Sequence, residues 1–190
     1  SFNNIGNLGR LANQMFQYAS LKGIARNLGY EYCIPPKKVF GQNDPLVDSD
    51  SLCIYDVFDI EEKNKIAISK NQFLMERMHE FDKELFESCP DNVDLYGYYQ
   101  SPKYFDHIKD EIKSDFTFSD EVESVCSEMF ETIQNGKKVI ALHIRRTDYT
   151  VNPNHPLQSM DYYKEALKTF DKNTNLLVFS DDPEWCQQQE

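Results

Sequence analysis

Two adjacent arginines, Arg145 and Arg146, follow an apolar run that ends in His143 and come shortly before Asp148. The run, residues 139–142, consists mostly of residues that favour strands, so it predicts a buried strand whose carboxyl end carries these polar side chains. Open parallel sheets bind their ligands at that end. A guanidinium pairs bidentately with phosphate oxygens, so two of them favour a dense anion such as a pyrophosphate. The alternative is a strand followed by a solvated basic turn.

A second apolar run, residues 175–179, is followed directly by Asp181 and Asp182. Because neighbouring parallel strands end at the same edge of a sheet, we expect these carboxylates beside the two arginines. A carboxylate accepts hydrogen bonds only, and it matches the N1–H and N2 amino donors of guanine, a donor pair that adenine and uracil lack. The two strand ends together suggest a guanosine diphosphate compound. The alternative for both carboxylates is ordinary capping of the helix that follows.

The first part of the chain opens on a predicted strand end, a glycine turn and a helix. Residues 2–5 form the strand end, and Asn13 and Gln14 begin a helix that extends to about Asn27, with Gly29 just beyond it. Such an opening is common in nucleotide- and sugar-binding α/β domains. The glycines match neither a Walker loop nor a G-x-G-x-x-G fingerprint.

The other elements must place these groups in one fold. Further short strands are predicted at residues 31–34, 52–58, 65–68 and 93–100, and helices between Ser119 and Gly136, at residues 161–170 and after Asp182. Residues 73–86 fit neither pattern. The alternation of strands and helices predicts an α/β fold with parallel sheets covered by helices on both faces.

The chain is acidic overall. Its 190 residues carry a net charge of −12, and its pI is about 4.8. Such a charge excludes nucleic acid or an anionic membrane as the main partner, although a small basic site for an anionic small molecule is compatible with it. A chain of this length can bury one core, or one core and part of a second.

The cysteines indicate a reducing compartment. There are five of them, an odd number, and no two have the C-x-x-C spacing, which argues against a disulfide framework or a zinc knuckle. No apolar run is long enough to span a bilayer and no signal peptide is seen, so we expect a cytoplasmic protein, or one peripheral to a membrane. A Golgi location would require an anchor before Ser1.

Four segments resemble the motifs of the α-1,2-fucosyltransferases, glycosyltransferase family 11. The segments are residues 9–18 (GRLANQMFQY), 97–105 (GYYQSPKYF), 143–149 (HIRRTDY) and 179–185 (FSDDPEW). They resemble G-x-L-G-N-Q-M-F-Q-Y, G-Y-F-Q-S-x-K-Y-F, H-x-R-R-G-D-Y and F-S-D-D-x-x-W, in the order in which that family has them.

The resemblance implies a GT-B fold, in which two Rossmann-like domains face a cleft. Residues 1–135 would form the acceptor-side domain, and residues 136–190 would form the beginning of the domain that holds GDP-β-L-fucose. The implied reaction transfers L-fucose with inversion from this donor to the 2-hydroxyl of a galactose-terminated glycan, without a metal or other cofactor. Residues 48–50 (DSD) resemble an Asp-x-Asp metal motif, but a solvated loop is the preferred interpretation.

The resemblance also assigns roles to single residues. The arginines would neutralise the leaving pyrophosphate, and Asp148 is the nearest carboxylate for a general base, with bracing an arginine or capping a turn as alternatives. The implied catalytic residues are Arg145, Arg146 and Asp148. The implied donor-binding residues are His143, Arg145, Arg146, Asp181, Asp182, Asn13 and Gln14.

The sequence departs from the family pattern at three places. Ala12 and Thr147 stand where the family usually has glycine, and the second change is shared with the α-1,6 branch. The chain ends at Glu190, before a serine- and tryptophan-rich segment that closes the donor site in the family. We therefore expect an incomplete second domain, whose open sheet edge favours self-association. The alternatives are a non-catalytic remnant that binds a nucleotide sugar or a glycan, and an unrelated small phosphate-binding α/β protein.

Overall fold

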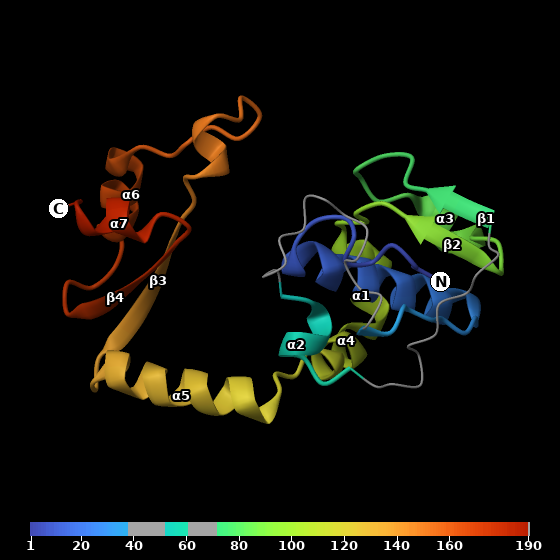
Figure 1. Cartoon of the computed structure of the whole chain (residues 1–190), viewed down its shortest axis with the longest axis horizontal. Coiled ribbons are helices and arrows are strands. Elements are labelled where there is room, and N and C mark those ends of the chain that lie inside the picture. Colours follow the sequence, from blue (N-terminus) through green and yellow to red (C-terminus); the bar gives the residue numbers. More distant parts are fainter. Residues whose placement is uncertain (38–51, 61–71, 190) are drawn as a thin grey trace. The chain divides into compact units, whose positions relative to one another are not determined.

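The computed structural model describes residues 1–37, 52–60 and 72–189 of the chain. The chain divides into two compact units, Ser1–Val122 and Glu123–Glu190, which are described separately (Figure 1). The division falls within the helix α5 (Asp120–Gln134), whereas the predicted division follows that helix. The assignment of acceptor and donor roles to the two parts stays a prediction.

The central element of the first unit is the helix α1 (Leu11–Leu28). Gly29 ends it in the left-handed conformation (φ 70°), which a residue without Cβ adopts at little cost. The N–H of the next residue, Tyr30, then donates to the Ala25 carbonyl at 2.9 Å and satisfies one of the last carbonyls of the helix. The predicted helix and its glycine end are confirmed.

A small parallel sheet flanks α1. β1 (Gln72–Met75) pairs with β2 (Val93–Tyr96), and α3 (Lys83–Ser88) lies between them in the chain. The segment that fits neither pattern in the sequence thus contains a strand and a helix. The predicted strand at residues 93–100 is four residues long, because the backbone turns at Gly97 (φ 152°) and Tyr99 (φ 51°).

Three predicted strands of the first unit are wrong. Residues 52–58 contain the helix α2 (Ile54–Val57), because the Asp56 carboxylate accepts the N–H of Cys53 at 2.8 Å and closes a capping box. Residues 2–5 and 31–34 form no strand, and only one backbone hydrogen bond, from Phe2 N–H to the Cys33 carbonyl (3.3 Å), joins them. The predicted strand at residues 65–68 lies outside the described residues.

The core of the first unit is aromatic and aliphatic. Tyr99 lies at its centre, fully buried, and contacts Phe2 and Tyr104 edge to face with ring centroids 5.8 Å apart in each pair. Two short 3-10 helices, η3 (Pro102–Tyr104) and η4 (Asp106–Ile108), lead into α4 (Lys109–Asp115), which completes the unit. Through this core, α1 packs against the segment that follows β2.

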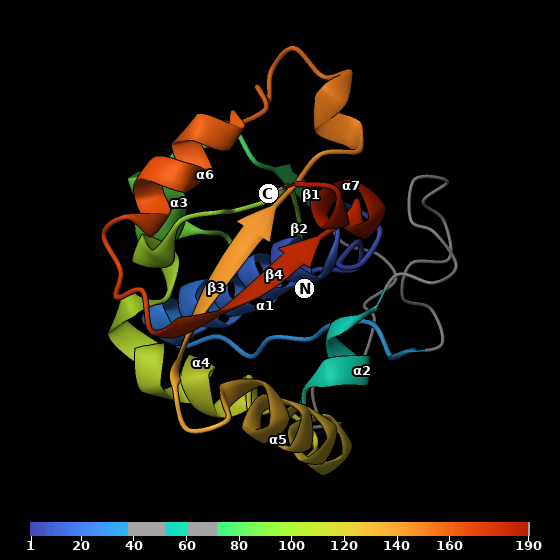
Figure 2. The ribbon, with the colours of Figure 1, turned by 90° about the vertical axis from the view of Figure 1, so that its left-hand side faces the viewer.

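The second unit is built on a parallel pair of strands. β3 (Lys138–Ile144) pairs with β4 (Thr174–Ser180) along their full lengths (Figure 2). The turn η5 (Asp148–Thr150) and the helix α6 (Met160–Leu167) connect them, and α7 (Pro183–Gln187) follows β4. The strands, the helices and the parallel pairing predicted here are confirmed, and so is the mixed α/β class.

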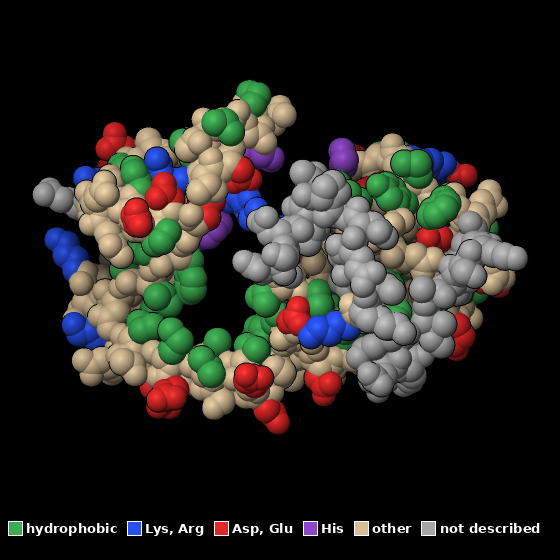
Figure 3. Space-filling model, in the orientation of Figure 1, with side chains coloured by type: hydrophobic (Ala, Val, Ile, Leu, Met, Phe, Trp, Pro, Cys, Tyr) green, Lys and Arg blue, Asp and Glu red, His purple; other side chains and the backbone are tan. Residues whose placement is uncertain are grey.

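The predicted burial of these strands is wrong. Of β3, only Ile144 is buried, and on β4 the side chains of Val178 and Phe179 are 40% and 52% exposed. The helices of this unit leave much of both faces of the two-stranded sheet exposed. Asn175 of β4 nevertheless contacts the end of α5, because its side-chain amide donates to the Ile133 carbonyl at 2.7 Å. Hydrophobic side chains consequently remain at the surface over α5 and the strands (Figure 3).

Candidate functional site

The carboxyl ends of β3 and β4 bring the two predicted sets of polar residues together. Ile144 pairs with Ser180 at the end of the ladder, so the segments that begin at Arg145 and Asp181 leave the sheet side by side. The N–H of Arg146 donates to one Asp181 carboxylate oxygen at 2.8 Å. The Thr147 hydroxyl donates to the other at 2.6 Å. The predicted meeting of arginines and carboxylates at one sheet edge is confirmed.

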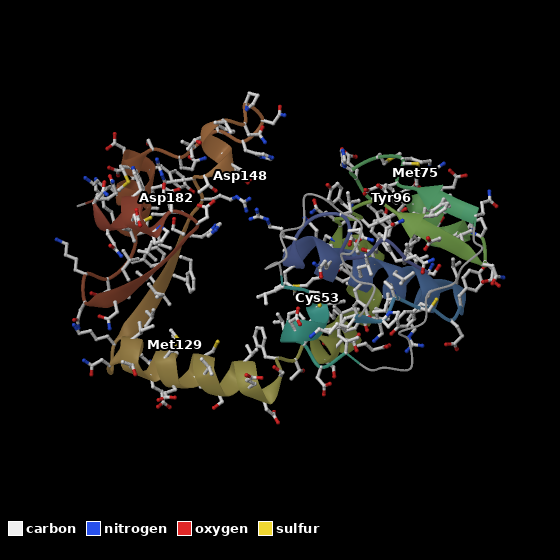
Figure 4. All side chains as sticks on the ribbon, viewed as in Figure 1. Cys53, Met75, Tyr96, Met129, Asp148 and Asp182 are labelled. Carbon is white, nitrogen blue, oxygen red and sulfur yellow. The ribbon has the colours of Figure 1, made fainter. Side chains whose placement is uncertain are left out.

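Asp148 braces Arg145. Asp148, labelled in Figure 4, follows the end of β3. Nε and Nη2 of Arg145 donate to its two carboxylate oxygens at 2.9 and 2.7 Å, a bidentate pair that raises the pKa of Arg145. The guanidinium carbon lies 5.1 Å from the centre of the Tyr149 ring, which itself stacks on His155. Asp148 therefore takes the bracing role that the sequence left as an alternative to a general base.

Arg146 is held by a carboxylate and a ring. Its Nε donates to Asp182 Oδ2 at 3.1 Å, and its guanidinium carbon lies 3.7 Å from the centre of the Trp185 ring. Within residues 1–37, 52–60 and 72–189, its terminal Nη1 and Nη2 groups donate no hydrogen bond. Four N–H donors of Arg146 thus have no acceptor among these residues.

Asp182 also caps α7. Its Oδ1 accepts the N–H of Trp185 at 3.2 Å, and its own N–H donates to the Ser180 hydroxyl at 3.0 Å. The capping alternative is therefore correct for Asp182. Trp185 is not among the site residues predicted from the sequence. Its position three residues after a capping aspartate, which places it over the first turn of the helix, was the available signal.

Asp181 is held as a carboxylate. Its partial burial raises its pKa, but the hydrogen bonds from the Thr147 hydroxyl and the Arg146 N–H outweigh burial, and the net pKa lies below the ordinary value. Each oxygen has a second lone pair for a further donor. His143 is exposed one residue before the end of β3, opposite Phe179 in the register.

Gln14 has a packing role in the first unit. Its side chain is 2% exposed, its Oε1 accepts the N–H of Ile54 at 3.1 Å, and its Nε2 donates to the Leu52 carbonyl at 3.4 Å. Asn13 is partly exposed and accepts a hydrogen bond from Nε2 of Gln100. The contacts predicted for both residues with the donor stay predictions, and of the two only Asn13 presents its side chain at the surface.

The polar residues farther along α1 hold the segment after β2. Nε2 of Gln17 donates to the carbonyls of Leu8 and Gly97, both at 3.0 Å, and the Ser20 hydroxyl donates to the Tyr99 carbonyl at 3.0 Å. Residues 9–18 and 97–105, which the sequence presents as two separate motifs, therefore form one interface inside the first unit.

Within residues 1–37, 52–60 and 72–189, no three His, Cys, Asp or Glu side chains lie close enough together to bind a metal ion. Asp48 and Asp50, the superficial metal motif, lie outside the described residues, and independence of metal stays a prediction. None of the helices described has both the length and the apolar character needed to cross a membrane.

Comparison with known proteins decides the family. The family model described as glycosyl transferase family 11 matches residues 1–189. The chain belongs to this family. No solved structure matches it at a significant level.

Three curated relatives show the range of this family. Over 94% of the chain, it is 27% identical to an α-1,2-colitosyltransferase and 24% identical to the O-antigen biosynthesis glycosyltransferase WbnK, both of Escherichia coli. It is 28% identical, again over 94% of the chain, to the mouse galactoside 2-α-L-fucosyltransferase Sec1. The aligned regions cover 68%, 72% and 49% of these three relatives. The chain thus spans about half the length of its mouse relative.

Proposed function

We propose that this family 11 chain belongs to an inverting fucosyltransferase that moves L-fucose from GDP-β-L-fucose to the 2-hydroxyl of a terminal galactoside. The observation that carries the proposal is the pair of arginines at the carboxyl ends of β3 and β4, where Nη1 and Nη2 of Arg146 have no acceptor in the part of the chain that the structure describes. The names of the relatives, which include an α-1,2-colitosyltransferase and a galactoside 2-α-L-fucosyltransferase, support this linkage.

The arginines would act on the leaving group. As the bond between the fucose anomeric carbon and the β-phosphate oxygen breaks, negative charge grows on the diphosphate. Two fixed guanidiniums stabilise that charge without a metal, because they are oriented before the reaction begins. In an oxocarbenium-like transition state the acceptor hydroxyl keeps its proton until late, so a strong base is less important.

The carboxylates divide the remaining work. Asp148 holds Arg145, and Asp182 holds Arg146 and caps α7. Asp181 keeps acceptor capacity for the guanine N1–H and N2 amino donors, and the exposed His143 orients the nucleotide on the same edge. In a GT-B arrangement, the first unit would bind the galactoside, and its surface residue Asn13 would face the donor from the opposite side of the cleft.

The nucleotide preference tests this proposal without requiring turnover. We expect isothermal titration calorimetry to give tighter binding for GDP than for UDP or ADP, and Asp181→Asn to remove most of that preference. Asp171→Asn is the matched control, because Asp171 is also exposed and also accepts a backbone N–H, from Asn173 at 2.9 Å, but lies at the other end of β4.

Mass spectrometry of a galactoside incubated with GDP-fucose then tests transfer itself. A fucosylated product whose linkage is α-1,2 supports the full proposal. GDP binding without any product favours the non-catalytic remnant, and a preference for UDP or ADP refutes the assignment of guanine and fucose together.

A further inference from the structure

The two arginines are built on one plan but differ in what they leave open. Each has a carboxylate at its edge and an aromatic ring against its face: Asp148 and Tyr149 for Arg145, Asp182 and Trp185 for Arg146. The pair with Asp148 uses two nitrogens of its arginine, and the pair with Asp182 uses Nε alone. Arg146 therefore offers the more complete set of donors.

The Trp185 ring fixes the plane of the Arg146 guanidinium. The centre of the ring lies 3.7 Å from the guanidinium carbon, compared with 5.1 Å for Tyr149 and Arg145. Tryptophan is the strongest of the aromatic partners for a cation, and the contact is partly shielded, because the side chain of Arg146 is 21% exposed. With its face against the ring and Nε held by Asp182, the guanidinium plane is fixed, and Nη1 and Nη2 are the nitrogens left for a ligand.

One helical turn supplies both restraints. Asp182 is the N-cap of α7, and the N–H that it accepts belongs to Trp185 itself. The cap thus sets the distance between the carboxylate and the ring, and it orients both with respect to the end of β4. A side chain as flexible as arginine loses much rotamer freedom when it binds an anion, and restraint in advance removes that cost.

We propose that Trp185 is a positioning residue, whose indole face holds Arg146 so that Nη1 and Nη2 meet the diphosphate of the nucleotide. The proposal rests on the proposed function for the nucleotide, but its central step is recognition of a diphosphate. The competing explanation is packing alone, in which Trp185 merely fastens α7 to the unit. The two explanations differ in whether the loss of the indole weakens the binding only of ligands that carry phosphates.

Three probes separate these explanations: GDP, guanosine and inorganic pyrophosphate, each titrated into wild type, Trp185→Leu and Trp185→Phe. We expect Trp185→Leu to weaken the binding of GDP and of pyrophosphate about three- to tenfold. Ordering a free, rotamer-rich side chain on binding lowers the affinity by about this factor. Guanosine affinity stays unchanged, and Trp185→Phe restores most of the loss because it keeps an aromatic face. Equal weakening of GDP and guanosine, or no weakening, overturns the proposal.

Fluorescence provides a test that needs no Trp185 variant. Trp185 is the single tryptophan of the chain, so all tryptophan emission comes from this side chain. We expect pyrophosphate to change the emission of wild type and not of Arg146→Met. An unchanged emission of wild type at saturating pyrophosphate overturns the proposal even if Trp185→Leu does not fold.

Different outcomes contradict the proposed function and the positioning role of Trp185. If wild type binds pyrophosphate and responds to Trp185→Leu, but prefers UDP or ADP to GDP, the positioning role stands and the fucosyltransferase proposal falls. If wild type binds none of the probes, both are overturned.

Discussion

The motif segments of the two units use polar side chains in opposite ways. In the first unit, Gln14, Gln17 and Ser20 are at most 2% exposed, and each donates hydrogen bonds to backbone carbonyls. In the second unit, the side chains of Arg145 and Arg146 are 31% and 21% exposed. Each of these arginines also has N–H groups for which no described residue is the acceptor. Both kinds of segment look alike in the sequence, as short polar stretches beside a strand or a turn.

The difference teaches how to separate packing from chemistry. A buried amide that loses its partner costs free energy, so Gln14 and Gln17 cannot exchange their backbone contacts for a ligand without weakening the unit. An arginine at a strand end keeps its charge near water and gains from an anion. Exposure together with unused hydrogen-bond donors, rather than membership of a motif, distinguishes the candidate ligand-binding side chains from the packing ones.

The largest expected effect of this contrast is on stability. In Gly23→Val, the new Cβ would collide with the backbone carbonyl of Tyr104, whose carbon would lie 2.8 Å away. Tyr104 cannot withdraw easily, because its hydroxyl accepts the N–H of Asp82 at 2.8 Å. We expect a loss of about 3 kcal/mol in the free energy of unfolding, measured with urea.

A glycine in an open position is the control for this substitution. Gly29→Ala places its Cβ where no described atom beyond its chain neighbours lies within 4 Å, so the left-handed backbone is its main cost, about 1 kcal/mol. If both variants lose the same stability, α1 is not packed against the segment after β2, and the contrast between the units is lost.

The second expected effect is on ligand affinity. Arg146→Ala removes the more open guanidinium, and we expect GDP to bind about 10- to 100-fold more weakly, as for a lost charged hydrogen bond. Arg145→Ala should cost less, because Asp148 already engages two of the arginine nitrogens. Calorimetry with Lys172→Ala, which removes an exposed charge before β4, corrects for net charge. A greater loss for Arg145→Ala would reverse the ranking of the two arginines.

The sequence predicted the second unit better than the first, for physical reasons. The strand ends of β3 and β4 follow from apolar runs and parallel pairing, which are local and regular. The first unit depends on side chains that bind distant backbone, such as Gln17 with Gly97 and Glu76, whose carboxylate accepts the N–H groups of Tyr98 and Tyr99 at 2.7 and 3.0 Å. No periodicity encodes such contacts, and the strand predicted at residues 93–100 therefore extended past Tyr96 in error.

The candidate site shows a similar limit. The types of Arg146, Asp181 and Asp182 could be recognised from the sequence, and so could their meeting at one edge. Their partners could not, because one carboxylate can cap a helix, bind guanine or brace an arginine equally well. The contact of Arg146 with Trp185 requires the geometry of α7, which only the folded chain has.

The smallest expected effect concerns the carboxylates of the two units at low pH. Burial raises the pKa of Asp82, but the hydrogen bonds from the Leu85 N–H and the Arg77 guanidinium lower the pKa by more than burial raises it. The net pKa is therefore below the ordinary value. The contribution of the Asp82 carboxylate to stability is therefore complete above about pH 3.9, its unfolded pKa, and is lost as the pH falls through its folded pKa.

Asp82→Asn keeps a capping side chain but loses the charge. Amide hydrogen exchange should show that α3 opens more readily at neutral pH in this variant and depends less on pH below about 3.9. Asp181→Asn, at an exposed site whose pKa is also lowered, should leave the exchange of α3 unchanged, whereas an equal response to both variants would show that the charge of Asp82 has no special role in the first unit.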